Sequence, residues 1–300
     1  MNALNTALQA QIREYYEQLT TQFDPELGIV WLFMHANPRP CFTPRLLEDL
    51  RKYQRILENN DGQFPVDGKL HPVHYQVLTS DVPGIYNLGG DLSLFMELIQ
   101  TGEREPLLDY ATACIDVLYP NAVNYNLPIT TISLVQGQAL GGGFEAALSS
   151  SVIIAERSAQ MGLPEILFNL FPGMGAYSLL ARRIDPIRAE QMILSGRIYT
   201  APELHEMGLV DVLAEDGEGT EAVHRFVKRH SRSRNGQLAM QRVRQRYNPV
   251  TREELMDITR IWVDAALQLE TKDLKVMDRL VRAQNRVCNQ QPAGPADQVA

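Results

Sequence analysis

The chain has 300 residues, of which 45% are hydrophobic and 21% are charged, and its formal net charge is -8. This length allows one large domain or one domain with a smaller appendage, and the acidic balance argues against nucleic acid as the main partner. Three widely spaced cysteines and six histidines without ligand spacing predict neither a disulfide framework nor a metal site.

The two ends of the chain and its longest apolar segments give expectations about location and local structure. No basic segment followed by an apolar run begins the sequence, and no window has the roughly 18 apolar residues of a membrane span, so we expect a cytoplasmic protein without membrane insertion. Apolar residues at helical spacing predict an N-terminal helix within residues 1–22. Residues 291–300 are rich in Pro, Ala and Gln and are expected to form a flexible tail.

Strands and helices alternate up to the first pair of adjacent glycines. Residues 28–34 and 74–79 predict strands, and residues 45–57 predict a helix. A further strand ends at Gly89-Gly90, and Asp91 begins another helix. A glycine turn of this kind presents unpaired N–H groups at a helix start, where negative charge is favoured.

A second strand–glycine–helix turn follows the β-branched stretch 129–133. Its three glycines, Gly141 to Gly143, permit positive φ and close approach to the backbone N–H groups, and Glu145 lies in the first turn of the next helix. Donors that hold an anion beside a group that moves a proton are the parts of an acid–base active site. Two such turns fit a two-donor oxyanion hole.

The same glycines allow another interpretation. Gly141 to Ala146 match the dinucleotide-binding fingerprint G-x-G-x-x-A. A parallel crossover needs a dozen or more residues, and only about eight residues separate Gly143 from the strand predicted at Val152. The spacing therefore disfavours a Rossmann helix.

Spacing alone also allows structural roles for the acids and large apolar residues. Glu145 and Glu165 can each be first-turn acids that complement a helix N-terminus. Met174, Trp262 and Leu280 are typical core residues.

The last third of the chain has helical periodicity. The pattern predicts a helical C-terminal region over residues 221–290, interrupted at Pro249, after a core of residues 23–220. Residues 225–246 are basic within this acidic chain, which is typical of a solvated helix face.

Taken in order, these segments resemble the crotonase (enoyl-CoA hydratase/isomerase) superfamily. The segments that carry the resemblance are Gly89 to Leu92, Gly137 to Glu145, Pro164-Glu165, Pro172 to Gly175, Leu194 to Arg197 and Glu206 to Val210. The resemblance implies an α/β spiral of repeated ββα units. It further implies that the helical C-terminal region covers the acyl pocket and takes part in assembly as trimers or dimers of trimers.

The resemblance also implies site roles. The amides of Gly90 and Gly142 would bind a thioester carbonyl and stabilise an enolate, and Glu145 and Glu165 would manage the proton and the water. The remaining substrate-binding residues are then Gly89, Leu140, Gly141, Met174, Trp262 and Leu280. The substrate would be an acyl carrier protein or CoA thioester, and no separate cofactor is expected. The basic stretch 225–246 would then meet the phosphopantetheine arm or an acidic carrier protein.

Within the superfamily, residues 39–44, 82–92 and 168–175 are most similar to diffusible signal factor synthases of bacterial quorum sensing. Such synthases dehydrate a 3-hydroxyacyl-acyl carrier protein to a cis-2-enoyl thioester and hydrolyse it, and members of that family can also bind a sensor kinase. Leu88 and Met174 depart from the small residues typical of ordinary hydratases. Two alternatives remain: an ordinary enoyl-CoA hydratase or isomerase of fatty-acid metabolism, and a non-catalytic regulatory protein.

Overall fold

The computed structural model of the chain describes residues 16–289, with side chains up to residue 282. Its larger sheet has the strand order β1-β2-β5-β7-β9-β12, in which β1 and β2 are antiparallel and all other neighbours are parallel. The strands are β1 (Leu19–Asp24), β2 (Ile29–Met34), β5 (Tyr75–Ser80), β7 (Thr130–Val135), β9 (Val152–Glu156) and β12 (Val212–Ala214). Every residue of β7 and β9 is buried, as expected for parallel strands covered on both faces.

A smaller sheet has the order β11-β10-β8-β6. Its strands are β6 (Ile85–Asn87), β8 (Gln138–Leu140), β10 (Gln160–Gly162) and β11 (Ile198–Thr200), and a separate hairpin joins β3 (Gln63–Val66) to β4 (Lys69–Pro72). Three successive units each give one strand to each sheet and then a helical segment, so the predicted spiral of ββα units is present. The segments that follow β6, β8 and β10 carry the two glycine turns and Glu165.

The helices largely match the segments with helical periodicity. They are α2 (Pro44–Asn59), α3 (Leu92–Thr101), α4 (Arg104–Ala122), α5 (Gly142–Ser149), α6 (Ala176–Arg183), α7 (Pro186–Ser195), α8 (Ala201–Glu206), α9 (Gly219–His230), α10 (Arg234–Tyr247), α11 (Arg252–Ala266) and α12 (Thr271–Asn289), with 3₁₀ turns η1 (Asn124–Asn126), η2 (Pro164–Phe168) and η3 (Ser231–Ser233). The Thr43 hydroxyl caps α2 by accepting a hydrogen bond from the Leu46 amide at 3.1 Å. None of the helices in the described part of the chain combines the length and apolar content of a membrane span.

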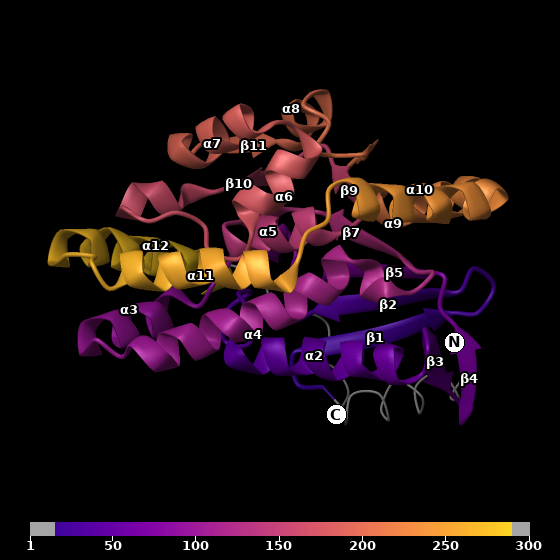
Figure 1. The fold of residues 1–300 in the computed structure, drawn as a ribbon, viewed down its shortest axis with the longest axis horizontal. Helices are drawn as coiled ribbons and strands as arrows, with labels where there is room; N and C mark the ends of the chain where they lie inside the picture. Colours follow the sequence, from indigo (N-terminus) through magenta and orange to yellow (C-terminus); the bar gives the residue numbers. More distant parts are fainter. Residues whose placement is uncertain (1–15, 290–300) are drawn as a thin grey trace.

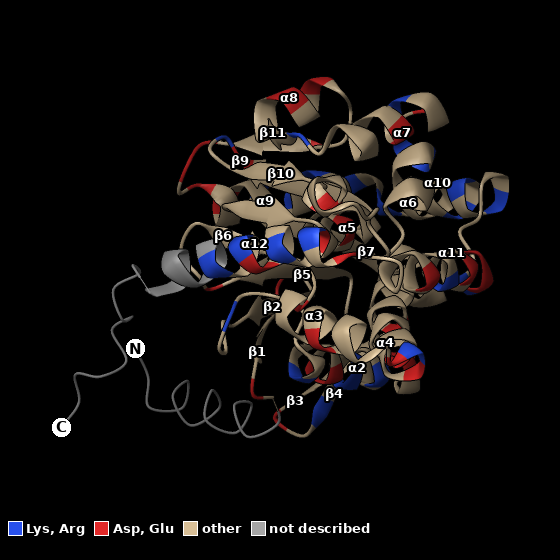
Figure 2. Cartoon of the chain, turned by 90° about the vertical axis from the view of Figure 1, so that its left-hand side faces the viewer, with Lys and Arg blue, Asp and Glu red and all other residues tan. Residues whose placement is uncertain are grey.

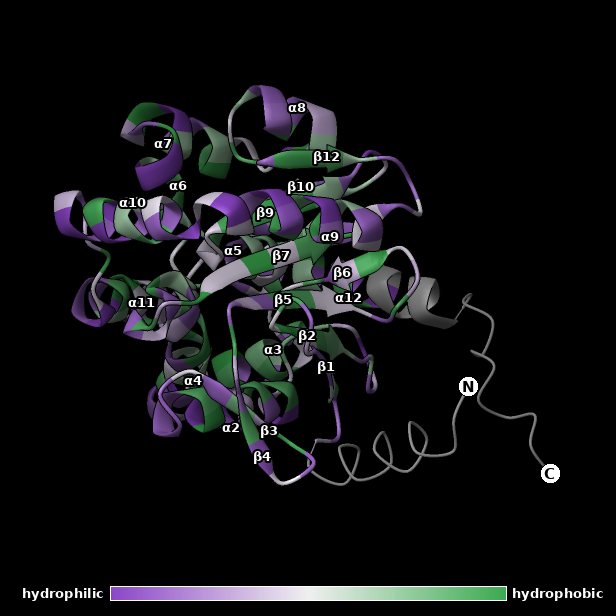
Figure 3. Cartoon of the chain, turned by 90° about the vertical axis from the view of Figure 1, so that its right-hand side faces the viewer, coloured by the Kyte–Doolittle hydropathy of each residue, from purple (hydrophilic) through white to green (hydrophobic). Residues whose placement is uncertain are grey.

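The predicted helical C-terminal region is divided between two places in the molecule. Helix α9 packs on β7 and β9, whereas α11 packs on α4 and α12 packs on α3 and η2 (Figure 1). Hydrophilic residues of α9 face outward, as Figure 3 shows, while Ala222, Val223 and Val227 are buried against the larger sheet. Helices α11 and α12 therefore lie beside α3 and α4, where they can close a cavity.

The prediction of a helix within residues 1–22 is wrong for the last residues of that range. Residues 19–22 belong to β1, whose pairing with β2 places Leu19 opposite Met34. The segment before this strand is also held outside a helix, because the Asp49 carboxylate accepts hydrogen bonds from the amides of Glu17 and Gln18, both at 2.8 Å. The rest of that helix prediction, residues 1–15, and the predicted tail, residues 291–300, lie outside the described residues.

The glycine-rich connection differs in one respect from expectation. Strands β7 and β9 are parallel neighbours, so a crossover does exist. It spans residues 136–151 and contains strand β8 as well as α5, which is only 8 residues long. The Rossmann crossover helix is thus absent, as predicted, but the added strand supplies the length that the short helix lacks.

Candidate active site

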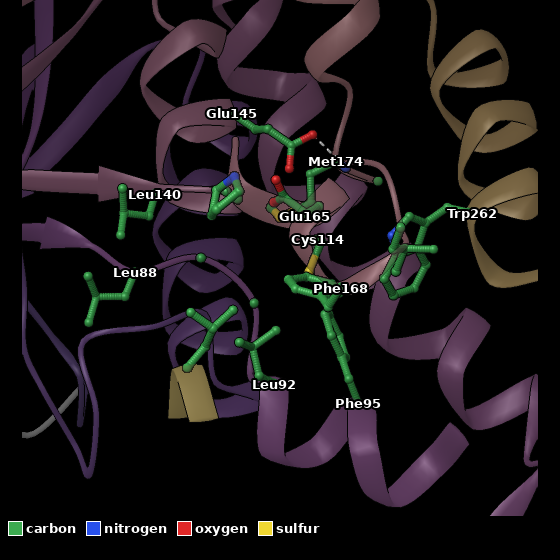
Figure 4. Close-up of a pocket in the computed structure, with 18 of the residues that line it drawn as sticks. Leu88, Leu92, Phe95, Cys114, Leu140, Glu145, Glu165, Phe168, Met174 and Trp262 are labelled. Carbon is green, nitrogen blue, oxygen red and sulfur yellow. Dashed lines mark hydrogen bonds between the residues drawn. The ribbon is translucent and has the colours of Figure 1, made fainter. Parts of the chain in front are cut away.

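A cavity of about 310 Å³ lies between the two glycine turns, η2 and the C-terminal helices (Figure 4). Every site residue predicted from the sequence lines it: Gly89, Gly90, Leu140, Gly141, Gly142, Glu145, Glu165, Met174, Trp262 and Leu280. The fold therefore brings to one place residues that are dispersed over much of the chain. No cluster of three or more His, Cys, Asp or Glu side chains suited to a metal ion occurs among residues 16–289.

The two glycine turns meet at the wall of this cavity. Gly89 has a φ of +93°, and a Cβ at this residue would lie 2.8 Å from the Leu140 carbonyl oxygen and 3.1 Å from the Gly142 nitrogen. A Cβ at Gly142 would in turn lie 3.4 Å from the Gly90 nitrogen and 2.6 Å from Met174 Sδ. Only glycine allows the backbones to approach this closely.

The amides of Gly90 and Gly142 remain available in these turns. Gly142 is the first residue of α5, and the earliest bond of that helix runs from the Glu145 amide to the Gly141 carbonyl at 3.0 Å. The first amides of a helix have no partner within it. For the Gly90 amide, no acceptor is found within the described residues.

Glu145 is held by backbone donors from the segment before α6. Its side chain is buried, and Oε1 accepts hydrogen bonds from the amides of Met174 at 2.8 Å and Ala176 at 2.9 Å. Burial raises the pKa of Glu145 to about 7, and the two amide hydrogen bonds oppose that rise because they stabilise the carboxylate. This group is therefore poised to exchange a proton near neutral pH.

Glu165 lies on η2, and Figure 4 shows its carboxyl group beside that of Glu145 in the cavity. Its Oε2 is buried and has no hydrogen-bond partner among the described residues. Burial raises the pKa of Glu165 well above its ordinary value, and the charge of Glu145 raises it further. Together the two groups favour a state with the proton on Glu165 and the negative charge on Glu145.

Aromatic rings close the opposite side of the cavity. The ring of Phe95 packs edge-on against Trp262 and Tyr110, with centroids 5.0 and 5.1 Å apart. A Cβ at Gly173 would lie 2.5 Å from the Trp262 ring, so α11 approaches the segment before α6 without an intervening side chain. The wall is thus apolar, which suits an acyl chain.

Sequence reasoning missed several lining residues. Phe95, Tyr110, Ala111, Cys114 and Phe168 also contact the cavity. Most of them lie on α3 and α4, where their spacing is that of ordinary core residues. The sequence feature that could have indicated Phe95 as a lining residue is that its helix, α3, begins directly after the first glycine turn.

Comparison with known proteins gives the family of the chain. The profile of the enoyl-CoA hydratase/isomerase family matches residues 72–277, and the chain belongs to this family. Among solved structures, an enoyl-CoA hydratase from Bacillus halodurans has a TM-score of 0.74 at 17% identity and covers 88% of this chain and 100% of that one. DspI of Pseudomonas aeruginosa has a TM-score of 0.60 at 22% identity, with 89% and 95% covered. These likenesses confirm the predicted crotonase fold.

Curated relatives are similar over part of their length. The mitochondrial methylglutaconyl-CoA hydratase of Rattus norvegicus is 33% identical over 149 residues, 50% of this chain and 45% of the relative. The mitochondrial methylglutaconyl-CoA hydratase 1 of Pyricularia oryzae is 30% identical over 216 residues, 71% of this chain and 53% of the relative. The chain thus spans about half the length of these two curated relatives.

Proposed function

We propose that this protein dehydrates a 3-hydroxyacyl thioester of an acyl carrier protein and then hydrolyses the thioester, releasing a cis-2-unsaturated fatty acid that serves as a diffusible quorum-sensing signal. The observation that carries the proposal is the carboxyl pair that lines one apolar cavity: Glu145 is held by two amides, and Glu165 has a buried oxygen without a partner among the described residues. Family membership supports acyl-thioester chemistry. The choice of this product rests on the resemblance of residues 39–44, 82–92 and 168–175.

The dehydration uses one proton shared between two carboxyl groups. One carboxylate takes the proton from Cα, and the electrons of that bond form the new double bond by way of an enolate. The amides of Gly90 and Gly142 hold the enolate oxygen. The other carboxyl group gives its proton to the C3 hydroxyl, which leaves as water. A pair with unequal pKa values supplies the required acid and base together.

The hydrolysis uses the same amides. Water adds to the thioester carbonyl carbon, and the tetrahedral oxyanion occupies the position that the enolate oxygen held before. The carbon–sulfur bond then breaks, the carrier thiol leaves with a proton from the attacking water, and the free fatty acid remains. Glu145 or Glu165 can accept the proton from water during the attack.

A basic helix lies beside the cavity on the side from which Leu280 reaches it. Helix α12 exposes Lys272, Lys275 and Arg279, of which Lys272 pairs with Glu270 at 2.9 Å. Figure 2 shows Lys and Arg segments in blue along this helix. They suit the phosphate of a phosphopantetheine arm or an acidic carrier protein. The basic stretch 225–246 lies instead on α9 and α10, and none of it lines the cavity.

The test is direct. Purified protein is incubated with 3-hydroxydodecanoyl carrier protein, and the lipid products are analysed by mass spectrometry. We expect free 2-dodecenoic acid from the wild type and none from Glu145→Gln or Glu165→Gln. The proposal fails if the wild type releases no free 2-enoic acid, or if the Glu145→Ala/Glu165→Ala double variant releases as much as the wild type.

A second candidate is an ordinary enoyl-CoA hydratase or isomerase of fatty-acid metabolism. The names of the hydratase relatives favour it, and it would use the same carboxyl pair. Rapid hydration of crotonyl-CoA, with 3-hydroxyacyl carrier protein left unchanged, would establish this alternative. A non-catalytic regulatory role predicts instead that both glutamate variants keep full biological function.

The partners, assembly and location remain predictions of this proposal. Binding of a sensor kinase, assembly as a trimer or dimer of trimers, and a cytoplasmic location accompany the synthase assignment. Pull-down with the sensor kinase, light scattering and cell fractionation would test them separately.

A further inference from the structure

A loop from the N-terminal part of the chain lies against the first glycine turn. The carbonyl of Pro40 accepts a hydrogen bond from the Leu88 amide, and the carbonyl of Gly89 accepts one from the Phe42 amide, both at 2.8 Å. The turn is therefore held by backbone hydrogen bonds on both sides of its first glycine. Gln18 fixes the loop itself, because its side chain bonds to Asn37 and Thr43.

Tyr110 connects this loop to the residue after the second glycine. Its hydroxyl donates to the Phe42 carbonyl and accepts a hydrogen bond from the Asp91 amide at 3.1 Å. On the other side, the Gly89 amide donates to Asn87 Oδ1 at 2.8 Å. The amides on both sides of Gly90 are thus committed to protein partners.

Arg39 also holds the first glycine turn, because its guanidinium group bonds to the side chain of Asp91. One guanidinium nitrogen donates to Asp91 Oδ1 at 2.7 Å, and another donates to Ser93 Oγ at 2.9 Å. The Arg39 and Asp91 side chains are only 17% and 13% exposed. Asp91 Oδ1 also caps α3 by accepting from the amides of Ser93 and Leu94.

We propose that Arg39 and Tyr110 are positioning residues that fix the direction of the Gly90 amide. This inference rests on the proposed function, in which that amide stabilises the enolate oxygen. Gly90 has no side chain of its own to fix its backbone, so its orientation depends on Gly89 and Asp91. The Gly90 N–H shares one planar peptide group with the Gly89 carbonyl, which bonds to the Phe42 amide. Tyr110 holds the other side of Phe42 and the Asp91 amide, and Arg39 holds the Asp91 side chain, so the peptide groups on both sides of Gly90 are tied to this loop.

A structural role and a positioning role predict different measurements. If Arg39 and Tyr110 only stabilise the fold, their loss lowers the melting temperature and leaves turnover per folded molecule unchanged. If they position the Gly90 amide, kcat falls by roughly 10- to 100-fold, since small displacements of a catalytic group have effects of that size. KM should change by less than about 3-fold, because ground-state binding depends mainly on the apolar wall.

The most specific probe is 3-ketododecanoyl-CoA. Its C2 proton can leave, and the resulting enolate absorbs in the near ultraviolet, so spectra of the bound ligand report how well the two amides stabilise an oxyanion. A thioether analogue without the carbonyl oxygen measures binding that does not use these amides. We compare wild type with Arg39→Met, Arg39→Lys and Tyr110→Phe.

The matched control is Arg182→Met. Arg182 also forms a partly buried ion pair, with Glu254 at 2.7 Å, but it does not line the cavity. We expect Arg182→Met to enolise the ligand like the wild type, and Arg39→Met and Tyr110→Phe to enolise it weakly while binding the thioether normally. Arg39→Lys should be intermediate, and it replaces Arg39→Met if the latter does not fold.

Two results would contradict the inference in distinguishable ways. Wild-type enolisation that Arg39→Met and Tyr110→Phe retain in full would overturn the positioning role and leave the proposed function intact. Absence of enolisation in the wild type itself would overturn the oxyanion hole, and the positioning role with it.

Discussion

The carboxyl group of Glu165 occupies the space that a side chain on residue 141 would need. An added Cβ at Gly141 would overlap Glu165 Oε1, and the backbone at Gly141 has a φ of +54° that side chains rarely adopt. The glycine is thus required for two independent reasons, one conformational and one steric. The identity of this residue decides whether the second carboxyl group can reach the cavity.

Substitution Gly141→Ala should therefore abolish most activity. We expect kcat/KM to fall by at least about 100-fold because Glu165 is displaced, and the positive φ to cost roughly 1–3 kcal/mol of stability. The control is Gly208→Ala, which has a φ of +78° and no atom within 4 Å of its added Cβ. It should lower the melting temperature yet retain turnover; equal losses of activity in both variants would contradict the steric explanation.

Stability should depend on pH through the carboxyl groups of Glu145 and Glu165. Both have pKa values raised above 4.5, so between pH 4.5 and about 7 the folded state binds more protons than the unfolded chain. Stability then falls as the pH rises through this window. The shift of Glu145 from 4.5 to about 7 corresponds to roughly 3 kcal/mol at ~1.4 kcal/mol per pKa unit.

The measurement is urea unfolding of wild type and Glu145→Gln at pH 5 and pH 8. The neutral glutamine should remove much of the cost of the buried charge at pH 8 and have little effect at pH 5. A variant that is equally destabilised at both pH values would show that folding does not raise the pKa of Glu145.

The pH dependence of activity should report the same pair. Below about pH 7 Glu145 becomes protonated, the pair loses its base, and kcat/KM should fall as the pH decreases. A second fall should occur at higher pH, where Glu165 loses the proton that serves as the acid. Rates measured from pH 5 to pH 10 check this, and a flat profile over that range would contradict the shared-proton mechanism.

Trp262 should limit the length or width of the acyl chain. Replacement by Leu opens the wall formed with Phe95 and should raise kcat/KM for longer acyl thioesters relative to shorter ones. A large-to-small change in a buried aromatic costs roughly 3 kcal/mol. Trp31→Leu is the control, because this buried tryptophan lies in a separate core cluster and should lower stability without changing chain-length preference. Equal chain-length preferences in the wild type, Trp262→Leu and Trp31→Leu would show that Trp262 does not limit the acyl chain.

Much of the site could be predicted because it depends on local sequence. Glycines at a strand end and an acid in the next helical turn, as at Gly141 and Glu145, define their geometry within a few residues. The prediction of a helix over residues 19–22 is wrong because Leu19 forms a strand by pairing with Met34. The spacing of apolar residues along the chain carries no information about a pairing partner on another segment. Trp262 against Gly173 is likewise a contact between distant segments, which no local pattern specifies.

The two amide hydrogen bonds of Glu145 come from the same short segment on which Trp262 packs. The residues that bond to Glu145, Met174 and Ala176, follow directly after Gly173, whose backbone contacts the indole ring. A change that moves the indole is therefore expected to move the amides that oppose the burial-driven rise in the pKa of Glu145. We therefore expect substitutions of Trp262 that alter acyl-chain preference to shift the pH dependence of activity as well, and paired substitutions of Trp262 and Glu145 to have non-additive effects.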